Sequence, residues 1–165
     1  MWPFPARRFS TGWNDAGDSM LVQQNGISFT IGRSRFTDGI VGSQEQSAKI
    51  FVRIEPESLG GVIFAQLDTG AAWSILDSQV AEELSLLNGQ GEPTTISTRL
   101  GGFSGRLERT RISIVADEGE SLNVEATVWV SPDWPGHSFL GYGGLLERIR
   151  FAVDPSDNTF YFGPV

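Results

Sequence analysis

The chain has 165 residues, of which 39% are hydrophobic and 20 are glycine, and it contains no cysteine. Its formal net charge of -8 repels polyanions, and the sequence has no basic stripe with interleaved aromatic residues, so we expect no nucleic-acid partner. The absence of cysteine excludes a disulfide framework and a thiolate metal site, and it leaves the cellular location undetermined. The high glycine content favours an all-β fold with many turns.

Residues 1–20 are rich in Pro, Gly, Asp and Ser and show no hydrophobic period, which predicts a flexible N-terminal extension. Residues 21–165 are then expected to form one domain. The first residues lack the apolar stretch of a signal peptide, and no later window approaches the length of a membrane span. We therefore expect neither kind of segment in this sequence.

Alternating or β-branched segments predict a series of strands, separated by turn-forming residues. A helix is predicted at residues 78–87, with Asp77 or Ser78 as its N-cap. A second short helix is expected at residues 143–151, and Asp117, Glu118 and Glu120 are expected at a solvated hairpin tip. The strands are predicted at residues 20–32, 48–55, 62–67, 94–100, 106–115, 121–130 and 160–163.

One apolar strand ends in a carboxylate, in the stretch "VIFAQLDTGAAWSIL" at residues 62–76. Asp68-Thr69-Gly70-Ala71 suits an ordinary turn, since Asp, Thr and Gly all favour turns. The apolar flanks instead predict a turn that is buried between two strands, where a carboxylate needs partners. Gly70 lets backbone N–H groups approach the carboxylate, and the Thr69 hydroxyl can lock the turn.

Two further stretches contain glycine at turns between predicted elements. In "RLGGFSGRLERT", the glycines at 101, 102 and 105 predict a mobile hairpin tip that can fold over a ligand. In "HSFLGYGGLLERI", the apolar pair Phe139-Leu140 precedes Gly141 and a helix. Each stretch alone also fits an ordinary turn or helix cap.

Taken together and in this order, the three stretches resemble the retropepsin family of aspartic proteases, over roughly residues 48–163. The resemblance implies an all-β, closed barrel with a flap hairpin and one or two short helices. It also implies an aspartic endopeptidase that acts on an extended peptide or protein substrate, with no metal and no cofactor. The implied residues are catalytic Asp68, supporting Thr69, Gly70 and Ala71, the flap Gly101, Gly102, Phe103, Ser104 and Gly105, and the substrate pocket Trp73, Phe139, Leu140 and Gly141.

The mechanism that the resemblance implies needs two aspartates, because two carboxyls about 3 Å apart share one proton and act as base and acid on a water molecule. The sequence has no second Asp-Thr-Gly or Asp-Ser-Gly. We therefore expect a symmetric homodimer in which Asp68 of the partner subunit completes the pair. Thr69 and terminal strands such as residues 159–163 are expected to contribute to the interface.

Other functions fit less well. His137 is the only histidine and reads as a loop residue, because "GHSFLG" does not match G-x-S-x-G. "GYGGLL" fails the G-x-G-x-x-G pattern, so nucleotide binding is not supported. A catalytically silent dimerisation or peptide-binding module remains open, since fold does not fix function. A role as one half of a two-lobed protease also remains open.

The sequence also departs from the family. Many retroviral members place an Asp directly after the catalytic Asp-Thr-Gly-Ala and an Arg directly after the apolar-apolar-Gly, as an ion-pair network near the dimer interface. Here these positions hold Ala72 and Tyr142. Both partners are absent together, so no buried charge is stranded, but the interface contacts must differ. We expect a weak dimer, or one that substrate stabilises.

Overall fold

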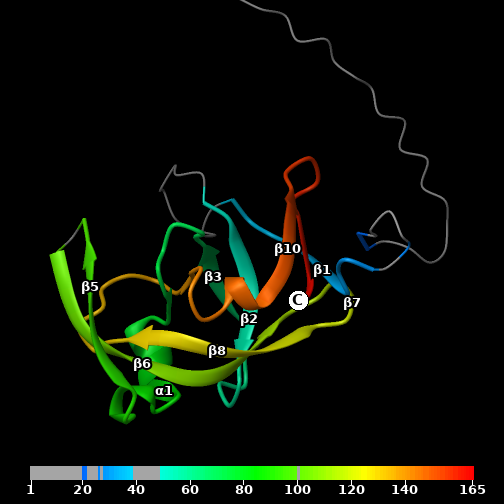
Figure 1. Cartoon of the computed structure of the whole chain (residues 1–165). Coiled ribbons are helices and arrows are strands. Elements are labelled where there is room, and N and C mark those ends of the chain that lie inside the picture. The colour runs from blue at the N-terminus through cyan, green and yellow to red at the C-terminus, as the bar shows by residue number, and fades with distance from the viewer. Residues whose placement is uncertain (1–19, 22–25, 27, 39–48, 100) are drawn as a thin grey trace, which may run out of the picture.

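The computed structural model describes residues 20–21, 26, 28–38, 49–99 and 101–165, and these residues are mostly strands (Figure 1). Two sheets account for all the described strands. The first sheet contains β2 (Phe51–Pro56), β3 (Ile63–Leu67), β4 (Ser74–Ile75), β5 (Glu92–Thr98), β6 (Gly101–Ile114), β8 (Leu122–Val130) and β9 (Phe139–Leu140). The second contains β1 (Gly32–Arg35), β7 (Glu118–Gly119), β10 (Ile149–Asp154) and β11 (Thr159–Pro164).

The larger sheet has the strand order β2-β3-β9-β4-β8-β6-β5, and β2 also pairs with β6. This extra pairing, from Ile54↔Ile114 to Pro56↔Ile112, closes six strands into a barrel and leaves β5 outside it. Closure leaves few free strand edges, which would otherwise be available for pairing with other chains. The predicted all-β closed barrel is confirmed.

The smaller sheet has the order β10-β11-β1-β7, and it joins the two ends of the described chain. Strand β11 pairs with β10 on one side and with β1 on the other, as in Phe162↔Phe151 and Phe162↔Gly32. Both edges of β11 are therefore used within the chain. The expectation that residues 159–163 contribute to a subunit interface stays a prediction, and β11 has no unpaired edge with which to extend its sheet into a second chain.

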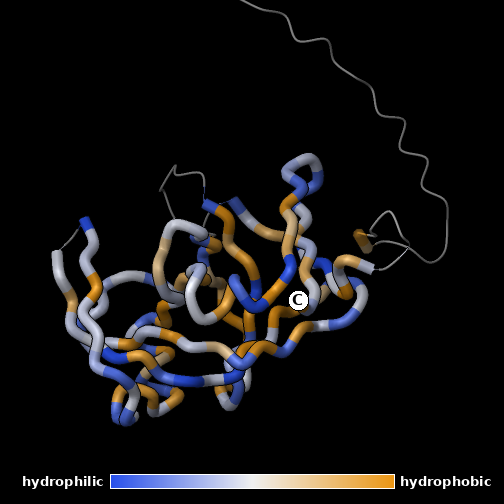
Figure 2. The backbone as a smooth tube through the Cα atoms, viewed as in Figure 1, coloured by the Kyte–Doolittle hydropathy of each residue, from blue (hydrophilic) through white to orange (hydrophobic). Residues whose placement is uncertain are grey.

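The hydrophobic core lies inside the barrel and continues beneath the smaller sheet. Figure 2 shows the apolar stretches of the backbone gathered in the barrel strands and in β10 and β11. Ile54, Ile112 and Ile114 of the barrel are fully buried, as are Phe160 and Phe162 of β11. Burying a side chain of this size contributes roughly 1.5–3 kcal/mol to the free energy of unfolding. The two sheets thus share one core and form one folded unit.

The first predicted helix is present but short. Helix α1 (Ser78–Glu83) begins after Asp77, whose side chain accepts a hydrogen bond from the Val80 N–H, and a 3-10 turn η1 (Leu86–Asn88) follows it. Asp77 is therefore the N-cap. The helix packs through Ala81, which is buried.

The second predicted helix is largely wrong. Only Leu146–Arg148 form a 3-10 turn, η2, and β10 begins at once at Ile149. Ile149, Phe151 and Val153 alternate along β10 and pair with β11 through a full ladder. Ladder pairing and burial outweigh the local helical spacing of "LLERI" here.

The N-terminal predictions fall mostly outside the described residues. The extension proposed for residues 1–20 does so apart from Met20, and it stays a prediction together with the boundary at 21. The first strand was expected at 20–32, of which 22–25 and 27 are not described, and β1 begins only at Gly32.

The acidic cluster is exposed to solvent between β6 and β8, as predicted, and it also makes specific contacts. Glu118 lies in β7, which pairs with β1, and its carboxylate forms an ion pair with Arg33 at 2.6 Å. Asp117 Oδ2 accepts the Arg35 N–H at 2.7 Å, and Oδ1 accepts from the Arg53 guanidinium. Burial opposes ionisation of Asp117, but these two donors lower its pKa below the ordinary value. The cluster therefore joins the small sheet to the barrel.

Among the helices of the described ranges, none combines the length and apolar character needed to cross a bilayer.

Candidate active site

Asp68 lies directly after β3, and its position is fixed from both sides. Its backbone N–H donates to the Leu140 carbonyl at 3.0 Å, which continues the parallel pairing of β3 with β9. Its Oδ1 accepts the N–H groups of Gly70 at 2.9 Å and of Ala71 at 3.2 Å. The predicted role of the turn as a source of N–H donors is confirmed.

Gly70 fits its position because the backbone comes close to the carboxylate. A Cβ at Gly70 would lie 3.3 Å from Asp68 Oδ1, which is a tight contact. The Ala71 N–H also donates to the Asp68 carbonyl at 3.2 Å, and this bond closes the turn. The short sequence Asp-Thr-Gly-Ala thus determines the carboxylate's orientation locally.

Strand β9 lies in the sheet between β3, which precedes the Asp68 turn, and β4, which follows it. Phe139 pairs with Gln66 of β3 and with Ile75 of β4. Gly141 follows β9, and its N–H donates to the buried Ser74 hydroxyl at 3.0 Å. A Cβ on Gly141 would lie 2.2 Å from the Trp73 carbonyl oxygen. Glycine is therefore required at position 141, where the segment after β9 crosses the segment that follows the Asp68 turn.

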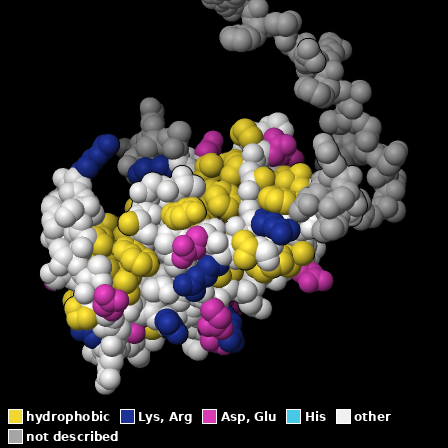
Figure 3. Space-filling model, in the orientation of Figure 1, with side chains coloured by type: hydrophobic (Ala, Val, Ile, Leu, Met, Phe, Trp, Pro, Cys, Tyr) yellow, Lys and Arg dark blue, Asp and Glu magenta, His cyan; other side chains and the backbone are white. Residues whose placement is uncertain are grey.

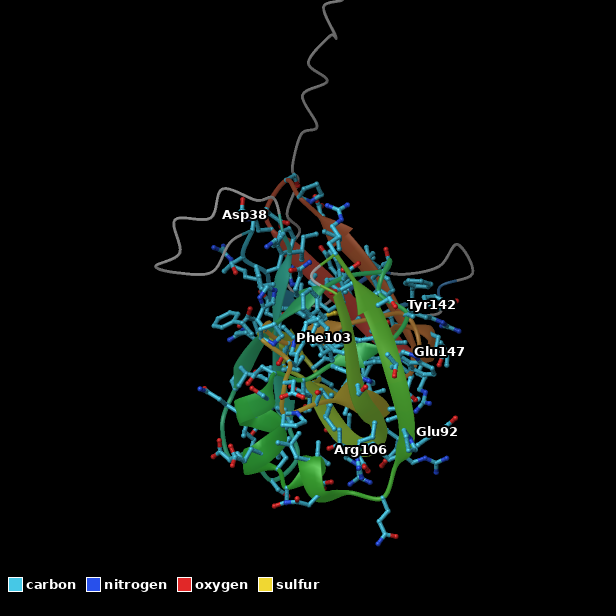
Figure 4. The ribbon with its side chains drawn as sticks, turned by 90° about the vertical axis from the view of Figure 1, so that its left-hand side faces the viewer. Asp38, Glu92, Phe103, Arg106, Tyr142 and Glu147 are labelled. Carbon is cyan, nitrogen blue, oxygen red and sulfur yellow. The ribbon has the colours of Figure 1, made fainter. Side chains whose placement is uncertain are left out.

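The turn itself is more exposed than expected. Asp68 is half-buried, and Thr69 and Gly70 are exposed, so the prediction of a turn buried between strands is wrong for the single chain. The apolar flanks "FAQL" and "WSIL" are held in the sheet, but the turn between them projects from it. The same surface carries Tyr142, which is 58% exposed and whose N–H donates to the Ala71 carbonyl at 2.9 Å. Figure 4 shows Tyr142 at the edge of the molecule, near Glu147.

The β5–β6 hairpin corresponds to the predicted flap and is called the flap below, but the predicted tip residues lie in a strand. Thr98 pairs with Gly101, and Gly101–Gly105 form the first part of strand β6. Figure 4 faces this hairpin, with Glu92 and Arg106 at its barrel end and Phe103 farther toward the tip. Glycine usually marks a turn, whereas three of the last five pairs of this hairpin place a glycine of β6 opposite a residue of β5.

A second hydrophobic cluster, which we call the aromatic wall, lies between the flap and the strands around Asp68. It joins Trp73, Phe103 and Phe139 of the predicted site to residues that the sequence analysis did not single out. The Phe103 and Phe139 rings both contact Trp134 edge-on, at centroid distances of 5.4 and 6.1 Å. The other members are Ile75, Ile96, Leu107, Trp129 and Trp134.

Not every predicted pocket residue belongs to this wall. Leu140 is 1% exposed and packs in the main core, next to Leu67 of β3. Trp129 and Trp134 were missed, although the segment "VWVSPDW" carries both, because only the fold places the end of β8 beneath the flap. The sequence feature that could have identified these two residues is a pair of tryptophans on either side of a turn.

His137 lies in a loop, as predicted. Its ring stacks on Phe139 at a centroid distance of 4.6 Å, and its Nε2 lies 2.9 Å from Gln66 Oε1. It is thus part of the packing around β9.

No group of three His, Asp or Glu side chains among the described residues is arranged to hold a metal ion. A cavity of about 660 Å³ contains none of the residues discussed at Asp68. It is lined by charged and hydroxyl side chains of the small sheet and its turns, namely Arg33, Ser34, Arg35, Asp117, Glu118, Asp157 and Thr159.

No protein-family model matches this chain, and no curated protein sequence matches it either. Solved structures do. The crystal structure of a retropepsin-like aspartic protease from Rickettsia conorii superposes with a TM-score of 0.54 at 19% identity, over 79% of this chain and 98% of that one. The solution structure of Simian Foamy Virus (mac) protease matches with a TM-score of 0.38 at 18% identity, over 56% of this chain and 87% of that one.

The first of these superpositions includes nearly the whole of the compared protease, and the closed barrel, the Asp68 turn and the hairpin over it lie within one folded unit here. The chain therefore has a retropepsin-like fold.

Proposed function

We propose that this protein is an aspartic endopeptidase that cleaves an extended peptide, with Asp68 of two identical chains as the catalytic pair. The observation that carries the proposal is the geometry of the Asp68 carboxylate. Two backbone N–H groups hold its Oδ1, and the turn that bears it is exposed. Since both donors reach Oδ1, Oδ2 can face a water molecule and a second carboxyl group.

The chemistry follows from bringing two such carboxyls together. At a separation of about 3 Å they cannot both ionise, so they share one proton. The ionised carboxylate takes a proton from the bound water as that water attacks the peptide carbonyl carbon. The protonated carboxyl gives its proton to the carbonyl oxygen, which forms a tetrahedral gem-diol. On collapse, the carboxyl that took the water proton donates it to the leaving nitrogen, the other carboxylate takes a proton from one hydroxyl, and the C–N bond breaks to release the amine and the new carboxylic acid. Metal and cofactor have no part in these steps.

Two features support a homodimer as the source of the second carboxyl. The described chain has one Asp-Thr-Gly turn, and Thr69 and Gly70 on it are exposed and available to a partner. Tyr142 adds an exposed aromatic side chain beside them. Figure 3 shows further hydrophobic side chains interspersed with charged ones on the face that carries β10. A two-fold axis beside Thr69 would place both turns face to face.

The aromatic wall and the flap support an extended peptide as substrate. Trp73, Phe103 and Phe139 are half-buried, so each still presents part of its ring. They come from the segment after Asp68, from the flap and from β9. A peptide between flap and turn would therefore meet apolar surface next to the carboxylate, and we expect cleavage beside large apolar side chains.

The test is a mixed-peptide cleavage assay with the wild-type chain, Asp68→Asn and a matched control, Asp157→Asn. Asp157 is an exposed carboxylate in the turn between β10 and β11. We expect Asp68→Asn to abolish cleavage while the protein stays folded, and Asp157→Asn to cleave like wild type. Cleavage by the folded Asp68→Asn variant would exclude the aspartic mechanism.

The same experiment separates the enzyme from a silent module with the same fold. Ala72 and Tyr142 replace the charge pair of many retroviral members, which is the observation that keeps this second function open. A silent module would bind peptides equally well with Asp68 or Asn at this position and would cleave none. Peptide binding can be measured by fluorescence, since Trp73 lies in the aromatic wall.

A further inference from the structure

The flap leaves the barrel at a defined point on β6. Strand β6 pairs with β8 from Ile114↔Leu122 up to Arg106↔Val130, and the pairing ends there. Its pairing with β5 continues farther, to Gly101↔Thr98. From Gly105 to the tip, the backbone of the described hairpin pairs only between its own two strands, and Phe103 contacts Trp134 through its side chain. Backbone contacts that fix the angle of the hairpin to the barrel therefore act at this point.

Trp129 reaches across this point from β8. Its side chain is fully buried, and its indole Nε1–H donates to the Thr94 carbonyl of β5 at 2.9 Å. Between them lies Gly105, where a Cβ would be 2.5 Å from the indole ring and 2.4 Å from the Val130 carbonyl oxygen. Glycine at 105 thus lets the indole pass beneath β6 and bond to the strand on its far side.

Ser131 makes the corresponding contact with the other flap strand. It is fully buried, and its hydroxyl donates to the Ser104 carbonyl at 2.7 Å while accepting the Asp133 N–H at 3.2 Å. Two buried donors two residues apart therefore bind one carbonyl on each strand of the hairpin. Thr94 is half-buried and Ser104 is exposed, so removal of either donor costs about one hydrogen bond of ordinary strength, roughly 1 kcal/mol.

We infer that Trp129 and Ser131 are positioning residues that clamp the flap where it leaves the barrel, and that the flap moves as a unit beyond Thr94 and Ser104. The role of this clamp in catalysis rests on the proposed function. The clamp sets the position of Phe103 against Trp134 within the aromatic wall, so that less ordering is left for the moment of substrate binding. Neither residue touches the reacting atoms.

Backbone amide exchange tests the clamp without any substrate. Trp129→Phe keeps an aromatic ring and removes the N–H donor, and Ser131→Ala removes the hydroxyl. We expect either variant to speed exchange at residues 95–103 by about fivefold, as the loss of one hydrogen bond of ordinary strength predicts, with barrel strands unchanged. Ser138→Ala is the matched control, because this buried hydroxyl donates at 2.9 Å to Asp77 and not to a flap strand.

The kinetics of peptide cleavage test the role of the clamp in catalysis. We expect KM to rise by about fivefold in Trp129→Phe and Ser131→Ala with kcat nearly unchanged, because the clamp acts on binding and not on the chemical step. Unchanged flap exchange in both folded variants would overturn the inference, as would exchange that rises equally in Ser138→Ala. A variant that loses kcat alone would also contradict it. Faster flap exchange in a protein that cleaves no peptide would support the clamp and contradict only the proposed function.

Discussion

Asp77 and Ser138 bind each other through two hydrogen bonds, although they lie far apart in the sequence. The Ser138 hydroxyl donates to Asp77 Oδ2 at 2.9 Å, and the Asp77 N–H donates to the same hydroxyl oxygen at 3.1 Å. Asp77 Oδ1 also accepts the Val80 N–H at 3.0 Å. One carboxylate therefore connects the start of α1 to the residue before β9.

Replacing Asp77 should destabilise the fold measurably. Asp77→Ala removes both the helix cap and the acceptor of the Ser138 hydroxyl, and we expect it to lower the free energy of unfolding by about 1–2 kcal/mol. Asp77→Asn keeps a capping oxygen and should lose less. Urea unfolding followed by fluorescence measures both, and equal stability of Asp77→Ala and wild type would show that the link contributes nothing.

Mixing experiments should reveal whether two chains share one active site. If wild-type and Asp68→Asn chains assort at random, mixing equal amounts converts about half of the wild-type chains into mixed dimers that have one carboxyl only. Activity per wild-type chain should then fall to about half. Activity that does not change on mixing, with exchange of subunits verified by light scattering of tagged chains, would show that one chain suffices.

Dilution provides an independent measure of the same assembly. A pair formed between chains makes specific activity fall as the dimer dissociates, and a tight active-site inhibitor should restore the dimer by mass action. Sedimentation and activity are measured over one dilution series, with and without a statine peptide. Constant specific activity in samples shown to be monomeric would contradict the shared pair.

Asp117 should make stability depend on acid pH. Its folded-state pKa is lowered, since the donors from Arg35 and Arg53 outweigh the opposing effect of burial. The stabilisation is therefore complete above the unfolded-state pKa, about 3.9, and is lost as the pH falls through the lower folded value. Because the Asp117 side chain is 42% exposed, we expect it to contribute less than about 1 kcal/mol.

The measurement for Asp117 compares unfolding of wild type and Asp117→Asn from neutral pH to acid. The variant should be slightly less stable at neutral pH, and the difference should vanish as the pH falls below the lowered folded-state pKa and the wild-type carboxyl becomes protonated. A difference that grows as the pH falls would have the wrong sign and would exclude this role.

The contact between Phe103 of the flap and Trp134 should affect substrate binding more than the chemical step. Phe103 packs edge-on against Trp134, and both lie in the aromatic wall. Phe103→Ala removes this contact and a surface for the peptide, so we expect KM to rise by about tenfold, as truncation of one aromatic contact of 1–2 kcal/mol predicts. Phe103→Tyr should retain most of the binding, and equal KM values for Ala and Phe would contradict the assignment.

Local sequence was sufficient for the Asp68 turn because its donors lie within three residues of the carboxylate. The barrel strands were likewise visible in the alternation of segments such as residues 121–130, of which 122–130 form β8. Exposure of the turn could not be predicted, because the apolar flanks only show that the adjoining strands are buried. Whether the turn between them projects depends on the other elements of the fold.

Other features depend on contacts between distant segments. The glycine at 105 resembled a turn residue, and only the position of the Trp129 ring shows that it is a strand residue with an indole beneath it. The segment after Gly144 has helical spacing, yet pairing with β11 makes residues from Ile149 onward a strand. Local helix propensity determines the structure of such short segments only where no pairing with another strand competes with it.

The position of β11 between β10 and β1 also bears on how the protein folds. Ser34 finds its ladder partner, Phe160, near the opposite end of the sequence, whereas β5 and β6 form a local hairpin. Closing so long a loop is entropically expensive, and contacts of this kind slow folding. During synthesis, the barrel hairpins can form first, while β1 must wait for the residues of β11 to emerge. Joining of the small sheet is thus expected to be the late step that commits the chain to its native state.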